Sequence, residues 1–403
     1  MTMTSESITA PAAPERKGLS GGMWLLALVP IFALGLVLTL LVVTGGGLTQ
    51  LAGPPVEQAL IQRITLPEPG LIQVEVVNDG PQTITIPQVL VDDAFFAFTA
   101  EPSTTIPRLG RATFTIPYPW VEEETHVVTL LTSLGVTFTG EVVAAVQTPQ
   151  PDLHLFLQFG LVGVYVGVVP IALGMLWYPF LRRLSRKAMM FILSLTVGLL
   201  VFLALGTWLD AQEFAAEIPV FWQGTPLILF VALATLGLLL VISRSSGRAG
   251  GPLGVAYRIA LGIGIHNLGE GLAIGAAFAL GQAALGTFLI LGFTLHNITE
   301  GIGIVSPLVE QKPKLQHFVL LGLLAGGPAI IGTWIGGFAF DPVLATVFLA
   351  IGIGAIVQVV WEVGKLVLRD SRSLNLPAIN WYSFGGVAAG IAIMYFTAFL
   401  VKF

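Results

Sequence analysis

Two patterns of hydrophobic and polar residues divide the chain. Between about residues 55 and 150, β-branched and polar residues alternate with a period of two, as in "LIQVEVVNDGPQTITIPQVLV", and Pro and Gly clusters separate these segments. From Leu153 onward, apolar runs of about 20 residues or more follow one another with few charges between them. The first pattern predicts a small antiparallel β-sandwich over 55–150. The second predicts an all-α polytopic membrane bundle over 153–402.

The apolar region divides into eight expected transmembrane helices. They lie at 153–179, 188–209, 222–243, 253–280, 283–307, 317–339, 342–367 and 380–401. A separate apolar run at 21–47 predicts an N-terminal transmembrane anchor, and the polar residues 1–20 before it predict a disordered cytoplasmic tail. A cleaved signal peptide is the alternative for 21–47, but such signals have apolar cores of only about 7 to 15 residues. We therefore expect nine membrane-spanning helices.

The charges of the connecting loops predict how the protein lies in the membrane. Lys and Arg occur in "RRLSRK", "SRSSGR", "EQKPK" and "RDSR", whereas the loops that alternate with these, "DAQEFAAE", "GQA" and "FDP", contain neither. Loops rich in Lys and Arg remain on the cytoplasmic side. This bias predicts an integral protein of the cell membrane, with the N-terminus cytoplasmic and both residues 55–150 and the C-terminus outside.

Composition agrees with a membrane protein and excludes some chemistry. Of the 403 residues, 55% are hydrophobic and only 10% are charged, and the mean hydropathy is +0.88. The lipid bilayer is thus an expected partner. A net charge of -5 without basic clusters gives no reason to expect nucleic-acid binding. Because the chain has no cysteine, disulfides and thiolate metal sites are excluded.

A short polar motif occurs twice within the apolar region. "HNLGEG" begins at His266 and "HNITEG" at His296, so that Glu270 and Glu300 each follow a histidine by four residues on the same helix face. The turn between the two helices is expected near Gly281, about 15 residues from either histidine. Antiparallel neighbours then bring both pairs to the same depth, near the middle of the bilayer, where each ionisable group costs about 2.5 to 3.5 kcal/mol.

Two imidazoles and two carboxylates at one depth form a plausible ligand set for a divalent transition metal. Zn²⁺, Fe²⁺ and Mn²⁺ all accept such ligands, and two carboxylates would neutralise the charge of the ion. A set without thiolates favours exchange of the metal, which suits transport. Hydrogen bonding between helices and a proton relay are the alternatives for these four residues.

The paired motifs resemble those of the ZIP family of divalent-metal transporters, which carry HNxPEG-type sequences on the fourth and fifth helices of an eight-helix block. The resemblance covers about residues 153 to 402 and implies that His266, Glu270, His296 and Glu300 form the main transport site. It also implies transport toward the cytoplasm, by movement of the helices that hold this site against a more static scaffold. Asn267 and Asn297 match positions that line a second metal site in binuclear members.

Three positions depart from the family pattern. The proline usual within each motif is Gly269 in one copy and Thr299 in the other. In the sixth helix of the block, Gly327 precedes Pro328 where a glutamate often supplies a carboxylate to the second site. We therefore expect one central metal, not two.

Other acidic residues are candidates for the cation pathway. Glu362 resembles a carboxylate of the family's exit route, although an ion pair with Lys365 or Arg258 explains it equally well. Asp210 and Glu213 would attract cations at the entrance, or lie in a solvated loop. His126, in the β region, is expected to be solvated beside its neighbouring carboxylates.

Together these features predict a transporter of a divalent transition metal, with zinc the leading substrate and iron or manganese as alternatives. The alternative function is a metal-responsive membrane sensor that binds the ion without transporting it. We do not expect an enzyme, because the chain has no His-Glu-x-x-His pattern and the central acids are already assigned as ligands. A homodimer, and an extracytoplasmic partner for the β region, are both left open.

Overall fold

The structure is a computed structural model that describes residues 21–43, 56–245, 251–280 and 282–401. The tail expected at 1–20 and the end of the anchor expected at 21–47 lie outside these ranges. The chain is mostly helical, at 64%, and it divides into two compact units, Met1–Val56 and Glu57–Phe403. In the described residues seven helices are long and apolar enough to cross a membrane, which agrees with a protein embedded in the bilayer.

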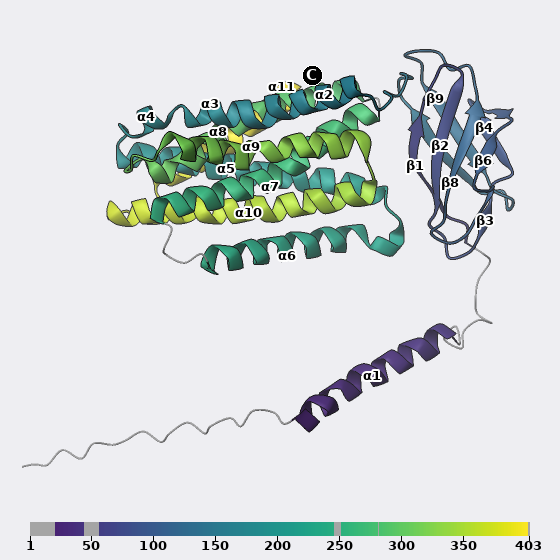
Figure 1. Ribbon diagram of the computed structural model, residues 1–403, viewed down its shortest axis with the longest axis horizontal. Coiled ribbons are helices and arrows are strands. Elements are labelled where there is room, and N and C mark those ends of the chain that lie inside the picture. Colours follow the sequence, from purple (N-terminus) through teal and green to yellow (C-terminus); the bar gives the residue numbers. More distant parts are fainter. Residues whose placement is uncertain (1–20, 44–55, 246–250, 281, 402–403) are drawn as a thin grey trace, which may run out of the picture. The chain divides into compact units, whose positions relative to one another are not determined.

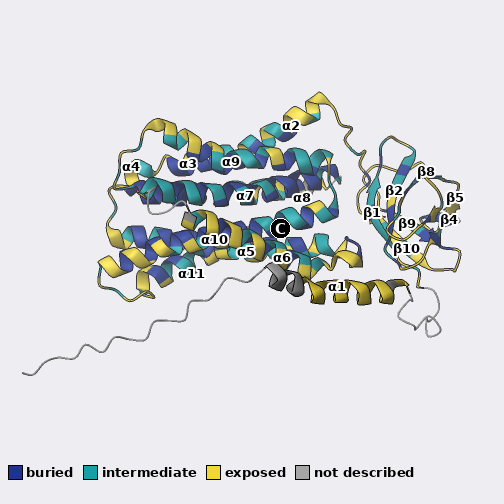
Figure 2. Cartoon of the chain, turned by 60° about the horizontal axis from the view of Figure 1, so that its bottom comes forward, coloured by how far each residue is buried: buried dark blue, intermediate teal, exposed yellow. Residues whose placement is uncertain are grey.

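The count of nine long spans is not reached among the residues described. Helix α1 (Gly21–Val43) belongs to the first unit and contains Pro30. Its described apolar stretch, Leu28–Leu41, is shorter than the seven long spans, as is Trp381–Phe396 in the last helix, α11 (Trp381–Val401). The described side chains of α1 are exposed (Figure 2).

The β region consists of antiparallel strands, as the alternating pattern predicts. One four-stranded sheet has the order β1-β2-β8-β6, a second has the order β10-β9-β4-β5, and β3 pairs with β7. The strand bounds are β1 Ala59–Thr65, β2 Leu71–Asn78, β3 Ile84–Thr85, β4 Gln88–Val91, β5 Ala94–Phe96, β6 Thr99–Glu101, β7 Thr105–Ile106, β8 Arg111–Pro117, β9 His126–Leu131 and β10 Thr137–Val142. Alternate side chains of β2, β4, β8 and β9 are buried together in one apolar core, as in a sandwich.

The remaining helices form an antiparallel bundle (Figure 1). Their bounds are α2 Leu153–Gly163, α3 Val169–Met175, α4 Tyr178–Leu181, α5 Arg186–Ala216, α6 Gly224–Ser245, α7 Gly251–Ala279, α8 Ala283–Val305, α9 Leu315–Phe338 and α10 Pro342–Ser373. Two predicted ends were too early. Helix α5 continues to Ala216 and α10 to Ser373, so the polar segments expected as loops near 210–217 and at 369–372 are largely helical.

The first span of the bundle is not one regular helix, as expected at 153–179, but is interrupted near its middle. A π-helical turn covers Val164–Val168 between α2 and α3. Pro170 lies at the start of α3, and its missing N–H cannot donate to the carbonyl of Val166, four residues earlier. The interruption therefore makes a backbone acceptor available to another helix.

Helix α7 is the most buried of the seven long spans and α6 the least (Figure 2). Small residues allow α7 to approach α9 at backbone distance: a Cβ added at Gly271 would lie 2.2 Å from the Ala329 carbonyl oxygen. Helices α8 and α3 approach equally closely, because a Cβ at Gly301 would lie 2.3 Å from the Ile171 oxygen. Glycines at these positions thus permit close packing of the helices.

Candidate functional site

The two copies of the motif meet at one level of the bundle. His266 lies thirteen residues before the end of α7, and His296 lies thirteen residues after the start of α8. All four ionisable side chains are buried, with exposed fractions of 2% for His266, 3% for Glu270, 4% for His296 and 1% for Glu300. The predicted convergence of the two pairs at equal depth is therefore present in the structure.

Glu270 joins the two histidines. The Nε2–H groups of His266 and His296 both donate to its Oε1, at 2.8 and 2.7 Å. Glu270 thus contacts the histidine of the neighbouring helix as well as the one on its own helix. With both Nε2 atoms used as donors, the remaining nitrogen of a neutral His266 ring, Nδ1, carries a lone pair.

The carboxylate of Glu300 has no comparable partner. In the described part of the chain, five buried acceptor atoms of this cluster lack a hydrogen-bond partner, and we call them the unpartnered acceptors: His266 Nδ1, Asn267 Oδ1, Asn297 Oδ1, Glu300 Oε1 and Glu300 Oε2. Most buried polar atoms in folded proteins are paired, and leaving one unpaired costs about 1 to 3 kcal/mol. All five can donate an electron pair, which is what a cation requires.

Three of the four motif residues satisfy a distance criterion for a common ion. One potential ligand atom from each of His266, His296 and Glu300 lies within 4.8 Å of the other two. Glu270 reaches this group through its hydrogen bonds to both imidazoles. The four residues could therefore surround one divalent cation if the Nε2 protons were released.

The two asparagines are oriented by backbone carbonyls. Nδ2 of Asn267 donates to the Ala325 oxygen of α9 at 3.0 Å, and Nδ2 of Asn297 donates to the Val166 oxygen at 3.0 Å. The latter is the acceptor that Pro170 leaves available. Since each amide nitrogen faces a carbonyl, the orientation of each amide is determined, and its oxygen is left as an acceptor.

The three positions that depart from the motif pattern of ZIP transporters have modest effects on the local structure. Helices α7 and α8 continue through Gly269 and Thr299 without interruption, and the hydroxyl of Thr299 donates to the His296 carbonyl at 2.7 Å. At Gly327 a Cβ would meet no described atom within 4 Å. The expectation of one central metal, not two, stays a prediction.

Asp210 lies next to the central residues and not in a loop. It is half-buried on α5 and lines a small cavity of about 10 Å³ together with Thr207, His266 and Glu270, which is about the room that one water needs. Glu213, one turn later on the same helix, is exposed. Burial, and after it the negative charge of Glu213, raises the pKa of Glu217 just beyond the end of α5. Of the two predicted entrance acids, the structure brings only Asp210 to the site.

Glu362 is buried and held by positive groups. Its Oε1 accepts hydrogen bonds from Lys365 Nζ and Ser243 Oγ, both at 2.8 Å, and lies 3.8 Å from Arg258 Nε. Both ion pairs considered for this residue are therefore present. Its place on α10, away from the central residues, is compatible with a role in a pathway.

His126 was expected to be solvated, and this expectation was wrong: it is only 3% exposed. Its Nδ1–H donates to Asp92 Oδ2 at 2.8 Å, and its Nε2 accepts from the Val121 N–H at 3.3 Å. Asp92 also accepts from the Tyr118 hydroxyl and from the Val127 N–H. Burial opposes ionisation of Asp92, but these hydrogen bonds outweigh it and lower its pKa. The hydrogen bond to Asp92, and then burial, raise the pKa of Tyr118 to about 12.

Comparison with known proteins adds no assignment. No model of a protein family matches this chain, and no curated protein matches it.

Proposed function

We propose that this chain is a membrane transporter of a divalent transition metal, with zinc the leading substrate, and that it carries the ion through a central site made by His266, Glu270, His296 and Glu300. One observation carries the proposal: the five unpartnered acceptors lie among these residues and their neighbouring asparagines. A cluster that served only to join helices would be expected to pair its acceptors. A bound cation would satisfy them.

The charge and composition of the cluster suit a transported ion. Two carboxylates would neutralise a divalent cation in the low dielectric of the bundle interior. Imidazole and carboxylate ligands accept zinc, iron and manganese, so the preference for zinc rests on the resemblance to ZIP transporters. The expected inward direction rests on that resemblance alone.

The packing of the helices supports alternating access. Backbone-distance contacts join α7 to α9 and α8 to α3, as described above, and they also join α5 to α11, where a Cβ at Gly198 would lie 2.2 Å from the Val387 oxygen. We propose that α7 and α8, with α9 and α3, move together against α5 and α10. The site would then face one side of the membrane at a time.

The proposal is tested by uptake of metal ions into proteoliposomes. The purified protein is reconstituted and offered a panel of Zn²⁺, Fe²⁺ and Mn²⁺, with the His266→Ala variant beside it. We expect saturable uptake of at least one ion by the wild type and none above background by the variant, with equal amounts of folded protein in both. Uptake at the wild-type rate by the variant would contradict the assigned site.

The same experiment separates the alternative functions. Metal that binds at the central residues without crossing the membrane would favour a metal-responsive sensor. A proton flux without bound metal would favour a proton relay built on the same histidines and glutamates.

A further inference from the structure

Helices α7 and α10 are in contact from the central residues toward one end of the bundle, and we call this line of contact the seam. A Cβ at Gly352 would lie 3.4 Å from His266 Nδ1, so α10 passes beside the site at this point. Gly262 lies against Gln358, and Arg258 lies against Glu362. In these contacts the residue numbers decrease along α7 while they increase along α10, so the two helices are antiparallel. From Gly352, Gln358 is about 9 Å along the helix and Glu362 about 15 Å.

Gln358 has an unusual environment on this seam. Its side chain is 2% exposed, and its Oε1 has no hydrogen-bond partner among the described residues. A Cβ at Gly262 would lie 2.6 Å from this oxygen and 2.5 Å from Val359 Cγ2, so any larger residue at position 262 would displace the amide. The chain thus keeps an unpartnered acceptor midway between the central site and Glu362, although such a group is unfavourable in a protein interior.

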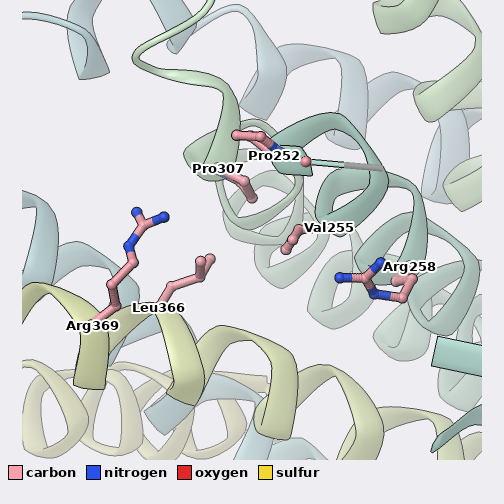
Figure 3. Close-up of a pocket in the computed structure, with 7 residues that line it drawn as sticks. Pro252, Val255, Arg258, Pro307, Leu366 and Arg369 are labelled. Atoms are coloured by element: carbon pink, nitrogen blue, oxygen red, sulfur yellow. The ribbon is translucent and has the colours of Figure 1, made fainter. Parts of the chain in front are cut away.

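Beyond Glu362 the seam reaches a cavity. It has a volume of about 280 Å³, and its lining includes Arg258, Val255, Leu366 and Arg369. Figure 3 shows the side chains from α7 and α10 around it, with Arg258 and Arg369 well apart. Arg258 lines this cavity and also faces Glu362. The oxygen of Gln358 therefore lies between a cluster of ligands at one end and a carboxylate beside a cavity at the other.

We propose that the amide oxygen of Gln358 is an intermediate ligand for the transported cation, between the central His/Glu site and Glu362. The inference rests on the proposed function and adds a route and a residue to it. A neutral oxygen can replace one water of a divalent ion and release it again, because it adds no charge that would hold the ion. An apolar residue at this position would leave about 15 Å of the seam without a side-chain ligand between Gly352 and Glu362.

The test measures Zn²⁺ uptake by full-length protein in proteoliposomes and Zn²⁺ binding at equilibrium in detergent. Gln358→Met keeps the length of the side chain and removes the oxygen. We expect its maximal uptake rate to fall about 10-fold, while the affinity of the central site and the stoichiometry of one ion remain those of the wild type. Gln358→Glu should also lower the rate, because a carboxylate beside Glu362 would retain a second ion, visible as a higher bound stoichiometry.

Thr346→Val is the matched control. It removes a buried hydroxyl from the same helix, but this hydroxyl bonds to the Pro342 carbonyl within the first turn of α10. Its uptake rate should equal that of the wild type. Gly262→Ala approaches the same oxygen from α7 and should reproduce the slow uptake of Gln358→Met, which guards against misfolding of either single variant.

The outcomes separate this inference from the proposed function. If the wild type transports Zn²⁺ and Gln358→Met transports it equally fast, the intermediate ligand is refuted and the transporter stands. Equal loss of central-site affinity and rate in Gln358→Met would also refute it, because the residue would then support the site itself. If the wild type neither binds nor transports any of Zn²⁺, Fe²⁺ and Mn²⁺, the proposed function fails, and this inference fails with it.

Discussion

The β region and the centre of the bundle each contain a cluster in which histidine meets carboxylate, but their hydrogen bonds differ. In the β region, Asp92 accepts from Tyr118, His126 and the Val127 N–H, and both ring nitrogens of His126 have partners. In the bundle, Glu270 accepts from both histidines, whereas both oxygens of Glu300 are among the unpartnered acceptors. The same residue types are satisfied in one place and unsatisfied in the other.

The difference indicates which cluster is structural. A network whose donors and acceptors are all paired can stabilise a fold without any ligand. A buried group of acceptors without donors is unfavourable unless something positive completes it. The hydrogen-bond partners of the buried polar atoms therefore distinguish the two clusters, whereas their residue types do not.

The largest expected effect is the difference in metal binding between two variants, each of which removes one negative charge from one of the clusters. Glu300→Gln keeps the shape of the side chain but should weaken metal binding more than about 100-fold, because even changes outside the immediate ligands cost about 10- to 100-fold. Asp92→Asn should leave metal binding unchanged. Isothermal titration of both variants with Zn²⁺ checks the contrast. Equal losses in the two variants would remove the distinction between the clusters.

Much of this comparison was predictable from the sequence, but not all of it. The repeated His-Asn and Glu spacing predicted that two pairs would converge at one depth, because helix periodicity and equal distances from the turn determine that. The partners of Asn267 and Asn297 were not predictable. They are backbone carbonyls 58 and 131 residues away, which carry no side-chain signal, although Pro170 marked one available acceptor.

The errors also have physical causes. Asp210 lies in a polar stretch that resembles a loop, yet α5 continues through it because its neighbours pack within the bundle. His126 lies beside an acidic run, but its position at the start of β9 points it into the sandwich, where Asp92 reaches it from the end of β4.

A smaller effect is expected from truncating the histidine of the satisfied cluster. His126→Ala removes the donor to Asp92 and leaves the Val121 N–H without its acceptor, and it should destabilise the β region by about 2 kcal/mol. Hydrogen exchange of β4 and β9 in the full-length protein measures this loss. Zn²⁺ uptake should be retained by whatever fraction stays folded. A stable β region in this variant would contradict the structural role assigned to His126.

Replacing an asparagine of the bundle cluster should weaken Zn²⁺ binding less than replacing Glu300. Asn267→Ala removes the hydrogen bond to the Ala325 carbonyl and one unpartnered acceptor, and we expect Zn²⁺ affinity to fall about 10-fold. The stoichiometry should stay at one ion per chain, since Gly327 provides no carboxylate for a second. Metal analysis after equilibrium dialysis gives this number. Two tightly held ions in the wild type would contradict a single site.

The smallest effect is the pH dependence of the β region. Because the pKa of Asp92 is lowered on folding, its contribution to stability is present above the ordinary value of 3.8 and is lost as the pH falls through the lower folded value. Because the pKa of Tyr118 is raised to about 12, its contribution is present below pH 10 and is lost between about pH 10 and 12. Hydrogen exchange in the β strands, corrected for intrinsic rates, should show protection falling in both windows. Tyr118→Phe should abolish the alkaline change and reduce the acid change, because the Tyr118 hydroxyl is one of the donors that lower the pKa of Asp92.

The central claim is that the unpartnered acceptors of the bundle bind one divalent cation. X-ray absorption at the zinc edge, on full-length protein loaded with one equivalent of Zn²⁺, tests it most directly. We expect a first shell of nitrogen and oxygen at about 2.0 to 2.2 Å, with the outer scattering of two imidazoles. His296→Ala should reduce that outer scattering to one imidazole. A bound zinc without imidazole scattering, or a wild-type protein that retains no zinc, would contradict the account.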